Sequence, residues 1–332
     1  MIRRREELEK FLSKTEFASA QLQPLAGDAS ARRYVRATFG GKQAMIMDTP
    51  AEGENFPAFV AIAEYLHKNG YSAPAILARD MQAGFLLLED FGDESFTRIL
   101  SKQKGEEENT LYAAAIDLLT QLRDSTNQNS LSLPLYDEEL YLREVSLFPD
   151  WFLPQIMPAE KAAFLRTEYM DIWREILRSF TLEKNVFVHR DFHADNLMWL
   201  PQREGAKRIG LLDFQDAVMG DAAYDLVSLL EDARRDVSNE LVDAMIKRYL
   251  AKTGEDSESF LAAYNILGAQ RNSKIIGIFA RLAVRDGKEN YLQFLPRVWV
   301  HLQRDIKHPL LKNLHDWLEI NIPIEARGEI KL

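Results

Sequence analysis

The spacing of apolar residues divides the chain into a strand-rich first part and a mainly helical remainder. The first part contains an extended stretch over 21–48, which includes runs at 32–39 and 42–47, and two further short runs at 75–78 and 85–88. Gly40-Gly41 separates the first two runs, and such a pair is typical of a β-hairpin. Residues 56–68 instead place apolar side chains three and four positions apart, which predicts a helix ended by Asn69-Gly70. The predicted order is strand, strand, strand, helix, strand, strand.

Beyond residue 94 helical periodicity dominates. It predicts helices at 110–123, 159–179, 240–251, 259–284 and 290–307, and strands only around 186–188, 197–200 and 208–212. The charged stretch 101–109 and the polar stretch 125–132 are interpreted as surface loops. The pattern therefore predicts an α+β fold of two lobes, a small β-rich lobe over 1–91 and a larger helical lobe over 92–332.

Composition narrows the function classes. With 332 residues, 46% of them hydrophobic and 28% charged, the chain has ordinary globular composition, and its net charge of −10 argues against a general nucleic-acid binder. The absence of cysteine excludes disulfides, thiolate metal sites and cysteine nucleophiles. The Arg-rich start lacks the apolar core of a secretory signal, and no apolar run approaches the roughly 20 residues of a membrane span. We expect a cytoplasmic protein without membrane insertion.

One constellation of residues indicates phosphoryl transfer. An apolar strand leads into His189-Arg190-Asp191, Asn196 follows five positions after the aspartate, and a second apolar strand ends at Asp213. Asp191 can accept the proton of an attacking hydroxyl, while Asn196 and Asp213 offer oxygen ligands for Mg²⁺. Each motif alone is common in turns and helix caps. Their order and spacing together favour phosphoryl transfer.

This block resembles the catalytic loop of the aminoglycoside phosphotransferase and choline kinase superfamily. The continuation through Asp213-Phe214-Gln215, Gly220-Asp221 and Tyr224-Asp225 fits the same pattern. The resemblance implies a protein-kinase-like fold that uses ATP and Mg²⁺, with Asp191 as the catalytic base. Gln215 stands where a protein kinase has glycine, which favours a small-molecule kinase. We interpret Asp225 as a cap or loop anchor.

The resemblance extends to the first lobe. It implies that a loop containing Gly27, Ser30 and Arg32 covers the nucleotide phosphates, and that a hinge strand meets adenine through Glu89 and Phe91. The third strand departs from the kinase pattern, because Met47 occupies the place of the lysine that binds phosphate. Glu64, the usual partner of that lysine, is thereby left without it. The nearest candidate cations to replace the lysine are Arg32, Arg33 and Arg36.

Further strings resemble one branch of the superfamily, the bacterial kinases that phosphorylate N-acetylmuramate and N-acetylglucosamine at the anomeric hydroxyl in cell-wall recycling. They are Gly27-Asp28-Ala29-Ser30, Met47-Asp48-Thr49-Pro50, Leu147 to Phe152, Gln270-Arg271-Asn272, Arg285 to Lys288 and Leu295 to Trp299. The resemblance covers almost the whole chain, and it includes the third strand without lysine.

Several side chains are candidates for contacts with such a sugar. Trp151 and Phe148 offer flat apolar faces, and Asp150 or Glu144 can bind hydroxyls. Three cations are candidates for a lactyl carboxylate: Arg271, Lys274 and Arg297.

Two other interpretations stay open. One is a kinase for another small substrate, an aminoglycoside or an amino alcohol, which strongly acidic surroundings of Asp191 would favour. The other is a non-catalytic nucleotide-binding pseudokinase, suggested by Met47. Neither the substrate, nor a protein partner, nor the oligomeric state follows from the sequence.

Overall fold

The computed structural model describes residues 2–25, 32–49, 56–102, 105–124, 131–183 and 185–330. The chain divides into two compact units whose segments interleave along the sequence. Unit 1 comprises Met1–Leu118, Asn129–Ser132 and Ala194–Asp216, and unit 2 comprises Leu119–Gln128, Leu133–His193 and Ala217–Leu332. Unit 1 holds a five-stranded sheet and unit 2 is mainly helical, which confirms the predicted two-lobed α+β fold.

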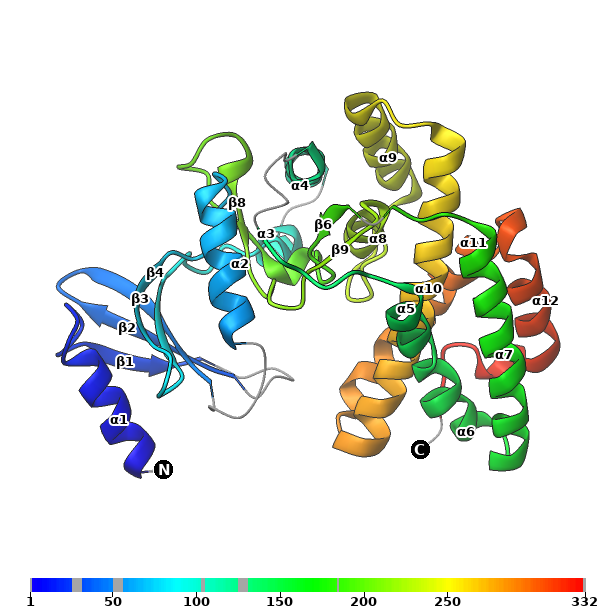
Figure 1. Cartoon of the computed structure of the whole chain (residues 1–332), viewed down its shortest axis with the longest axis horizontal. Coiled ribbons are helices and arrows are strands. Elements are labelled where there is room, and N and C mark those ends of the chain that lie inside the picture. Colours follow the sequence, from blue (N-terminus) through cyan, green and yellow to red (C-terminus); the bar gives the residue numbers. More distant parts are fainter. Residues whose placement is uncertain are drawn as a thin grey trace. The chain divides into compact units, whose positions relative to one another are not determined.

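The sheet of unit 1 is antiparallel, with the order β1-β2-β3-β5-β4 (Figure 1). Its strands are β1 (Gln21–Pro24), β2 (Arg33–Phe39), β3 (Lys42–Asp48), β4 (Ile76–Asp80) and β5 (Phe85–Glu89). The predicted hairpin is confirmed: Phe39 pairs with Lys42 around Gly40 and Gly41, whose φ angles of 58° and 79° require the left-handed region.

One face of this sheet packs against α1 (Ile2–Leu12), a helix that the sequence analysis did not predict. Phe11 and Leu12 belong to the same buried cluster as Ala44 and Ile46, and the rings of Phe11 and Phe85 stack with centroids 5.7 Å apart. The charged run at the start of α1 conceals its apolar stripe in the sequence.

The remaining helices of unit 1 correct one prediction and confirm another. Helix α2 (Phe56–Lys68) has the predicted bounds. The predicted loop at 101–109 is wrong, because α3 (Phe96–Lys102) runs into it and α4 (Glu106–Asp124) begins within it. Three glutamates occupy the first turn of α4, where negative charge stabilises the positive end of the helix dipole. The predicted loop at 125–132 lies largely outside the described residues.

Unit 2 consists mainly of helices of different lengths and contains one short strand pair. They are α5 (Glu138–Val145), α6 (Leu153–Ile156), α7 (Ala159–Ser179), α8 (Ala223–Leu230), α9 (Asn239–Thr253), α10 (Ser257–Asp286), α11 (Leu295–Asp305) and α12 (Lys312–Asn321), with β6 (Val186–Val188) antiparallel to β9 (Val218–Gly220). The helix predicted at 290–307 is instead a 3₁₀ segment, Glu289–Phe294, followed by α11. Pro296 lies in the first turn of α11, where its missing N–H costs no hydrogen bond.

Helix α10 contributes many residues to the large core of unit 2. Gly277 allows a close backbone contact there, since a Cβ on it would lie 2.2 Å from the carbonyl carbon of Leu147. The neighbouring π-helical turn, Phe148–Phe152, inserts Phe148 and Phe152 into the core against Trp299. Phe148 is completely buried, so the prediction that its ring is offered to a sugar is wrong.

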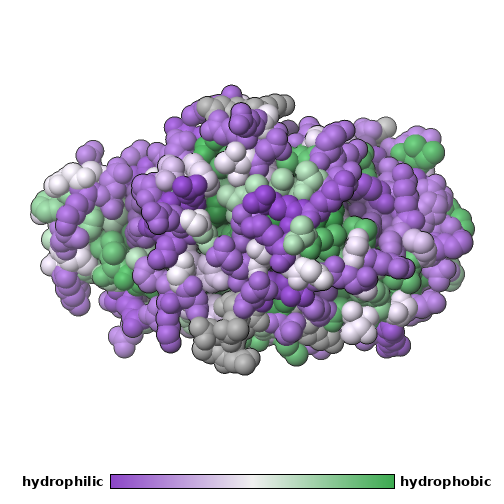
Figure 2. Space-filling model, turned by 90° about the horizontal axis from the view of Figure 1, so that it is seen from above, coloured by the Kyte–Doolittle hydropathy of each residue, from purple (hydrophilic) through white to green (hydrophobic). Residues whose placement is uncertain are grey.

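None of the helices in the described ranges is long and apolar enough to cross a bilayer. On the face drawn in Figure 2, hydrophilic side chains predominate and the apolar ones form small separate patches, as is normal on protein surfaces.

Candidate active site

The predicted catalytic loop follows β6 in unit 2. Val186, Phe187 and Val188 are all buried, and the chain leaves this strand through Arg190, whose φ of 75° is unusual for a residue other than glycine. Asp225 on α8 holds this bend, because its carboxylate accepts hydrogen bonds from the backbone N–H of His189 at 2.7 Å and of Arg190 at 2.9 Å. The interpretation of Asp225 as a loop anchor is therefore confirmed.

Asp191 lies directly after this bend, in surroundings that favour its charged form. Burial raises the pKa of Asp191, but the charges of Lys274, His193, Arg271 and His189 outweigh burial and leave its pKa below the usual value. Asp191 is therefore a carboxylate at neutral pH, which is the form that can accept a proton.

Glu144 on α5 connects the catalytic loop to α10. Its buried carboxylate accepts hydrogen bonds from Lys274 Nζ at 2.8 Å, from Gln270 Nε2 at 3.0 Å, from the Arg190 guanidinium and from the Tyr136 hydroxyl. Burial raises the pKa of Glu144, but the two cations and these donors lower it to about 2. A buried hydrogen-bonded network of this kind fixes the positions of its members.

The predicted sugar-binding residues have different environments within unit 2. Trp151 is half-buried against the core, and Asp150 is paired with Arg166 at 2.6 Å. Arg297 donates to Asp236 at 2.5 Å and to the carbonyl oxygen of Ala233 at 2.8 Å.

Arg271 differs from these residues. It is only 5% exposed, and its Nη1 has no hydrogen-bond partner among the described residues.

Asn196 and Asp213 lie close together in unit 1. The strands β7 (Leu197–Trp199) and β8 (Ile209–Leu211) are antiparallel, and the bond from Leu212 N to Asn196 O at 3.0 Å extends their pairing toward both residues. Asp213 has a φ of 60° and a half-exposed side chain that accepts a hydrogen bond from Gln215 Nε2 at 3.0 Å. An amide oxygen and a carboxylate at one strand end are ligands that Mg²⁺ accepts.

Arg32 is the small-lobe cation nearest to this pair. It is buried, its Nη1 is 3.7 Å from Asp213 Oδ1, and its guanidinium lies 5.9 Å from the centre of the Phe59 ring. Met47 is fully buried, and Glu64 pairs with Arg79 at 2.8 Å. The lysine–glutamate pair of kinases is thus absent at these two positions, and Arg32 is the candidate replacement. Gly27 and Ser30 lie outside the described residues.

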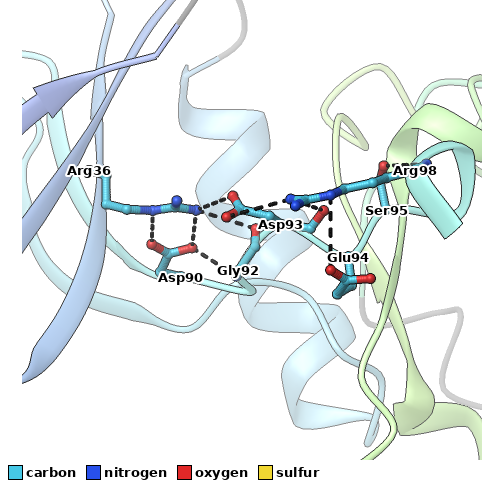
Figure 3. Close-up of polar contacts among 7 residues, drawn as sticks. All are labelled: Arg36, Asp90, Gly92, Asp93, Glu94, Ser95 and Arg98. Atoms are coloured by element: carbon cyan, nitrogen blue, oxygen red, sulfur yellow. Dashed lines mark hydrogen bonds and ion pairs between the residues drawn. The ribbon is translucent and has the colours of Figure 1, made fainter.

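The segment that follows β5, which the sequence analysis predicts to be the hinge, is held by a different arginine. Arg36 donates to Asp90 at 2.5 Å, to Asp93 at 2.9 Å and to the carbonyl oxygen of Gly92 at 3.3 Å (Figure 3). These carboxylates raise the pKa of Arg36. Arg98 also approaches Asp93, at 3.7 Å. Arg36 is therefore occupied by Asp90 and Asp93, and Arg33 is exposed. Of the three arginines considered as replacements for the kinase lysine, Arg32 is the buried one.

Glu89 and Phe91, the predicted adenine contacts, share a partner that the sequence analysis missed. Arg203 binds the carboxylate of Glu89, and its guanidinium lies 5.2 Å above the Phe91 ring. Gly210 lies under that ring, where a Cβ would come within 2.7 Å of a ring atom. No local signal marks Arg203, because more than a hundred residues separate it from Glu89.

Comparison with known proteins assigns the family. Residues 21–261 match the family described as "Phosphotransferase enzyme family". The chain belongs to this phosphotransferase family. A Caulobacter vibrioides protein named N-acetylmuramate/N-acetylglucosamine kinase is 39% identical over 96% of this chain and 96% of its own length. A Pseudomonas aeruginosa protein of the same name is 36% identical over 91% of this chain and 89% of its own. The protein is accordingly a kinase.

Solved structures of this phosphotransferase fold agree with the architecture described above. The choline kinase LicA from Streptococcus pneumoniae has a TM-score of 0.62 at 15% identity, with 91% of this chain and 97% of that chain covered. An ADP-bound aminoglycoside phosphotransferase has a TM-score of 0.56 at 16% identity, with 90% and 96% covered. At this level of identity the similarity concerns the fold alone.

Proposed function

We propose that this phosphotransferase uses ATP and Mg²⁺ to phosphorylate the anomeric hydroxyl of N-acetylmuramate or N-acetylglucosamine. Two kinds of support meet in this proposal. The curated relatives at 39% and 36% identity carry the names of these two sugars. The charges around Asp191 disfavour the substrates of the main alternative.

The observation that carries the proposal is that two cations of α10, Lys274 and Arg271, lie near enough to Asp191 to lower its pKa. The carboxylates nearby are held within unit 2: Glu144 binds Lys274, and Asp225 binds the backbone of the catalytic loop. An aminoglycoside or an amino alcohol carries ammonium groups, which nearby lysine and arginine repel. A neutral or acidic sugar meets no such repulsion.

Asp191 would act as the base in the reaction. The oxygen of the sugar hydroxyl forms a bond to the γ-phosphorus while the bond from that phosphorus to the bridging oxygen of ADP breaks. The hydroxyl proton passes to the Asp191 carboxylate. The bend at Arg190, held by Asp225 and Glu144, would orient this carboxylate toward the hydroxyl.

The lowered pKa of Asp191 favours an acidic hydroxyl as the nucleophile. A carboxylate of lowered pKa is a weak base, so it removes a proton most readily from the most acidic hydroxyl available. On these sugars that is the anomeric hydroxyl, because the ring oxygen withdraws electrons from the same carbon. This argument favours the anomeric position over the primary 6-hydroxyl.

The residues of unit 1 fit a nucleotide with Mg²⁺. No group of three or more His, Asp or Glu side chains able to hold a metal occurs in the described ranges. Asp213 and Asn196 match instead the usual Mg²⁺ site, in which phosphates and water complete the coordination. Bound there, Mg²⁺ would neutralise charge on the phosphates. Arg32 would bind phosphate, and the hinge at Glu89 and Phe91 would meet adenine. A kinase that takes ATP is expected in the cytoplasm.

The position of transfer can be tested through the reducing end of the product. Phosphorylation at the anomeric oxygen abolishes the reducing end, whereas phosphorylation at the 6-hydroxyl preserves it. The purified protein would be incubated with ATP, Mg²⁺ and either sugar, and the phosphorylated product assayed for reducing power. We expect a non-reducing sugar phosphate. A reducing phosphate would refute the anomeric position, and no phosphate on either sugar would refute the substrate class.

A further inference from the structure

Arg271 is a buried cation for which the described residues supply no anionic partner. It lies on α10, only 5% of it is exposed, and within the described residues it forms no salt bridge and its enclosed Nη1 donates no hydrogen bond. Arginine keeps its charge in proteins and carries five N–H donors. A buried guanidinium left in this state is costly, so a buried arginine ordinarily has an anionic partner.

The polar neighbours of Arg271 on α10 each donate to a carboxylate of unit 2. Gln270 and Lys274 donate to Glu144 at 3.0 and 2.8 Å. Asn272 donates to Glu231 at 2.7 Å and to Asp305 at 2.9 Å. Carboxylates on α5, at the end of α8 and on α11 therefore bind the polar residues before and after Arg271, but among the described residues none binds Arg271. This contrast indicates that its partner arrives with a ligand.

The position of Arg271 points to the sugar as that ligand. Lys274, less than one turn away on α10, donates to Glu144, which also binds Arg190, the residue before Asp191. The charge of Arg271 acts in addition on Asp191, the proposed base, and helps to lower its pKa. The guanidinium therefore lies within electrostatic reach of the carboxylate that contacts the acceptor hydroxyl. All of these residues belong to unit 2.

We propose that Arg271 binds the carboxylate of an acidic sugar acceptor and thereby determines the preference for N-acetylmuramate over N-acetylglucosamine. The inference rests on the proposed function. N-Acetylmuramate differs from N-acetylglucosamine by a lactyl ether that ends in a carboxylate, and the planar guanidinium fork fits a carboxylate through two parallel hydrogen bonds.

The two other candidate cations are already occupied. Lys274 is held by Glu144, and Arg297 by Asp236. With the neutral sugar bound, water can occupy the place of the carboxylate, so N-acetylglucosamine remains a substrate.

The test compares three acceptors: N-acetylmuramate, its carboxamide, which has nearly the same shape but no charge, and N-acetylglucosamine. We expect Arg271→Met to lower kcat/KM for N-acetylmuramate about 10- to 100-fold, the range of a charge-assisted hydrogen bond. Values for the carboxamide and for N-acetylglucosamine should change less than about 3-fold. Arg271→Lys should recover part of the loss. Arg297→Met is the matched control, and it should leave the ratio of the three values unchanged.

A second measurement separates ligand binding from a purely structural role. In the free protein, Arg271→Met should keep or raise the midpoint of thermal unfolding, because it removes an unpaired buried charge. N-Acetylmuramate should raise the midpoint of the wild type and no longer that of the variant. A fall in the midpoint of the free variant, with equal losses on all three acceptors, would overturn the inference in favour of a structural role.

Three other kinetic outcomes would also overturn the inference. An increased KM for ATP with an unchanged acceptor ratio would assign Arg271 to the nucleotide phosphates and overturn the inference while leaving the proposed function intact. If the wild type had equal kcat/KM for N-acetylmuramate and its carboxamide, the inference on Arg271 would likewise be overturned, and the proposed function would remain intact. A wild type that phosphorylates none of the acceptors would overturn the proposed function and this inference together.

Discussion

The two units differ in how the cations near their candidate ligand sites are paired. In unit 1 the arginines near the candidate nucleotide residues are paired within the unit: Arg36 with Asp90 and Asp93, and Arg203 with Glu89. Arg32 lies 3.7 Å from Asp213. In unit 2 Glu144 binds both Arg190 and Lys274, and Arg271 has no carboxylate partner among the described residues.

The difference suggests how each unit meets its ligand. In unit 1 the charges of Arg32 and Asp213 already face each other. Mg²⁺ bound at Asp213 and phosphate bound at Arg32 would therefore replace this contact between the two side chains. In unit 2 Arg271 lacks a carboxylate among the described residues, so it would gain a partner when an anionic acceptor binds. Substitutions in the two units should therefore have separable effects, on nucleotide in one case and on the acceptor or its chemistry in the other.

The largest effect is expected at Asp191, in unit 2. Asp191→Asn keeps the shape of the side chain but removes the proton acceptor, so kcat should fall about 10²- to 10⁴-fold. The dissociation constant of ATP should stay nearly unchanged, because the nucleotide residues lie in unit 1. Steady-state kinetics and calorimetric nucleotide binding measure the two quantities.

Asp195→Asn is the matched control for this change. Asp195 lies in the same loop but binds the hydroxyl of Thr97, and its loss should leave kcat within about 3-fold. If Asp191→Asn kept near-full activity at saturating Mg²⁺, the assignment of the base would be wrong.

An intermediate effect is expected at Glu144, which positions the acceptor side through Arg190 and Lys274. Glu144→Gln should lower kcat about 10- to 100-fold, since a shift of about 1 Å in a reacting group can have an effect of this size. The KM for ATP should change little.

The same variant should alter stability in acid. The pKa of Glu144 is lowered from 4.5 to about 2 in the folded protein. Its charge therefore contributes stability fully above about pH 4.5, and this contribution is lost as the pH falls through about 2. The shift corresponds to roughly 3 kcal/mol at most.

Denaturant unfolding at pH 6 and pH 3.5 measures this contribution. The free energy of unfolding of Glu144→Gln should decrease less between these pH values than that of the wild type. Glu139→Gln, an exposed position on the same helix, should behave as the wild type does. Equal pH dependence of all three proteins would contradict the role of Glu144.

Local patterns account for what the sequence predicted correctly. The bounds of α2 and α7 and the hairpin at Gly40-Gly41 follow from periodicity and turn chemistry over short stretches. The loop containing Asp191 and Asn196 and the strand end at Asp213 are short motifs of the same kind. Helix α1 and the start of α4 were missed because charged residues crowd those segments.

Long-range pairings account for most of what the sequence did not predict. The bonds from Arg190 and Lys274 to Glu144 join residues 46 and 130 positions apart, and the bond from Arg203 to Glu89 spans 114 positions. A local sequence pattern does not show which of several arginines is paired with a carboxylate. From the sequence, Arg271 and Arg297 were therefore equivalent candidates. The structure distinguishes them, because Arg297 is paired with Asp236 and Arg271 has no carboxylate partner among the described residues.

The smallest effect is expected at Arg32, and it concerns unit 1. Replacing Arg32 by Met removes the buried cation beside Asp213, so the dissociation constant of ATP should rise about 10-fold, the lower end of the range for a charge-assisted hydrogen bond. The same change leaves Asp213 without its nearby positive charge, so the Mg²⁺ concentration for half-maximal rate should stay equal or fall.

These opposite directions are the signature of an arginine that serves phosphate, because damage to the whole site would weaken nucleotide and metal alike. Arg33→Met, at the exposed neighbouring position, is the matched control and should leave both constants unchanged. Adding Met47→Lys to Arg32→Met should restore part of the ATP affinity, since it returns a cation to the third strand where kinases carry theirs. If Arg32→Met left ATP binding unaltered, the phosphates would be bound by metal and backbone alone. The contact between Arg32 and Asp213 would then have no role in nucleotide binding.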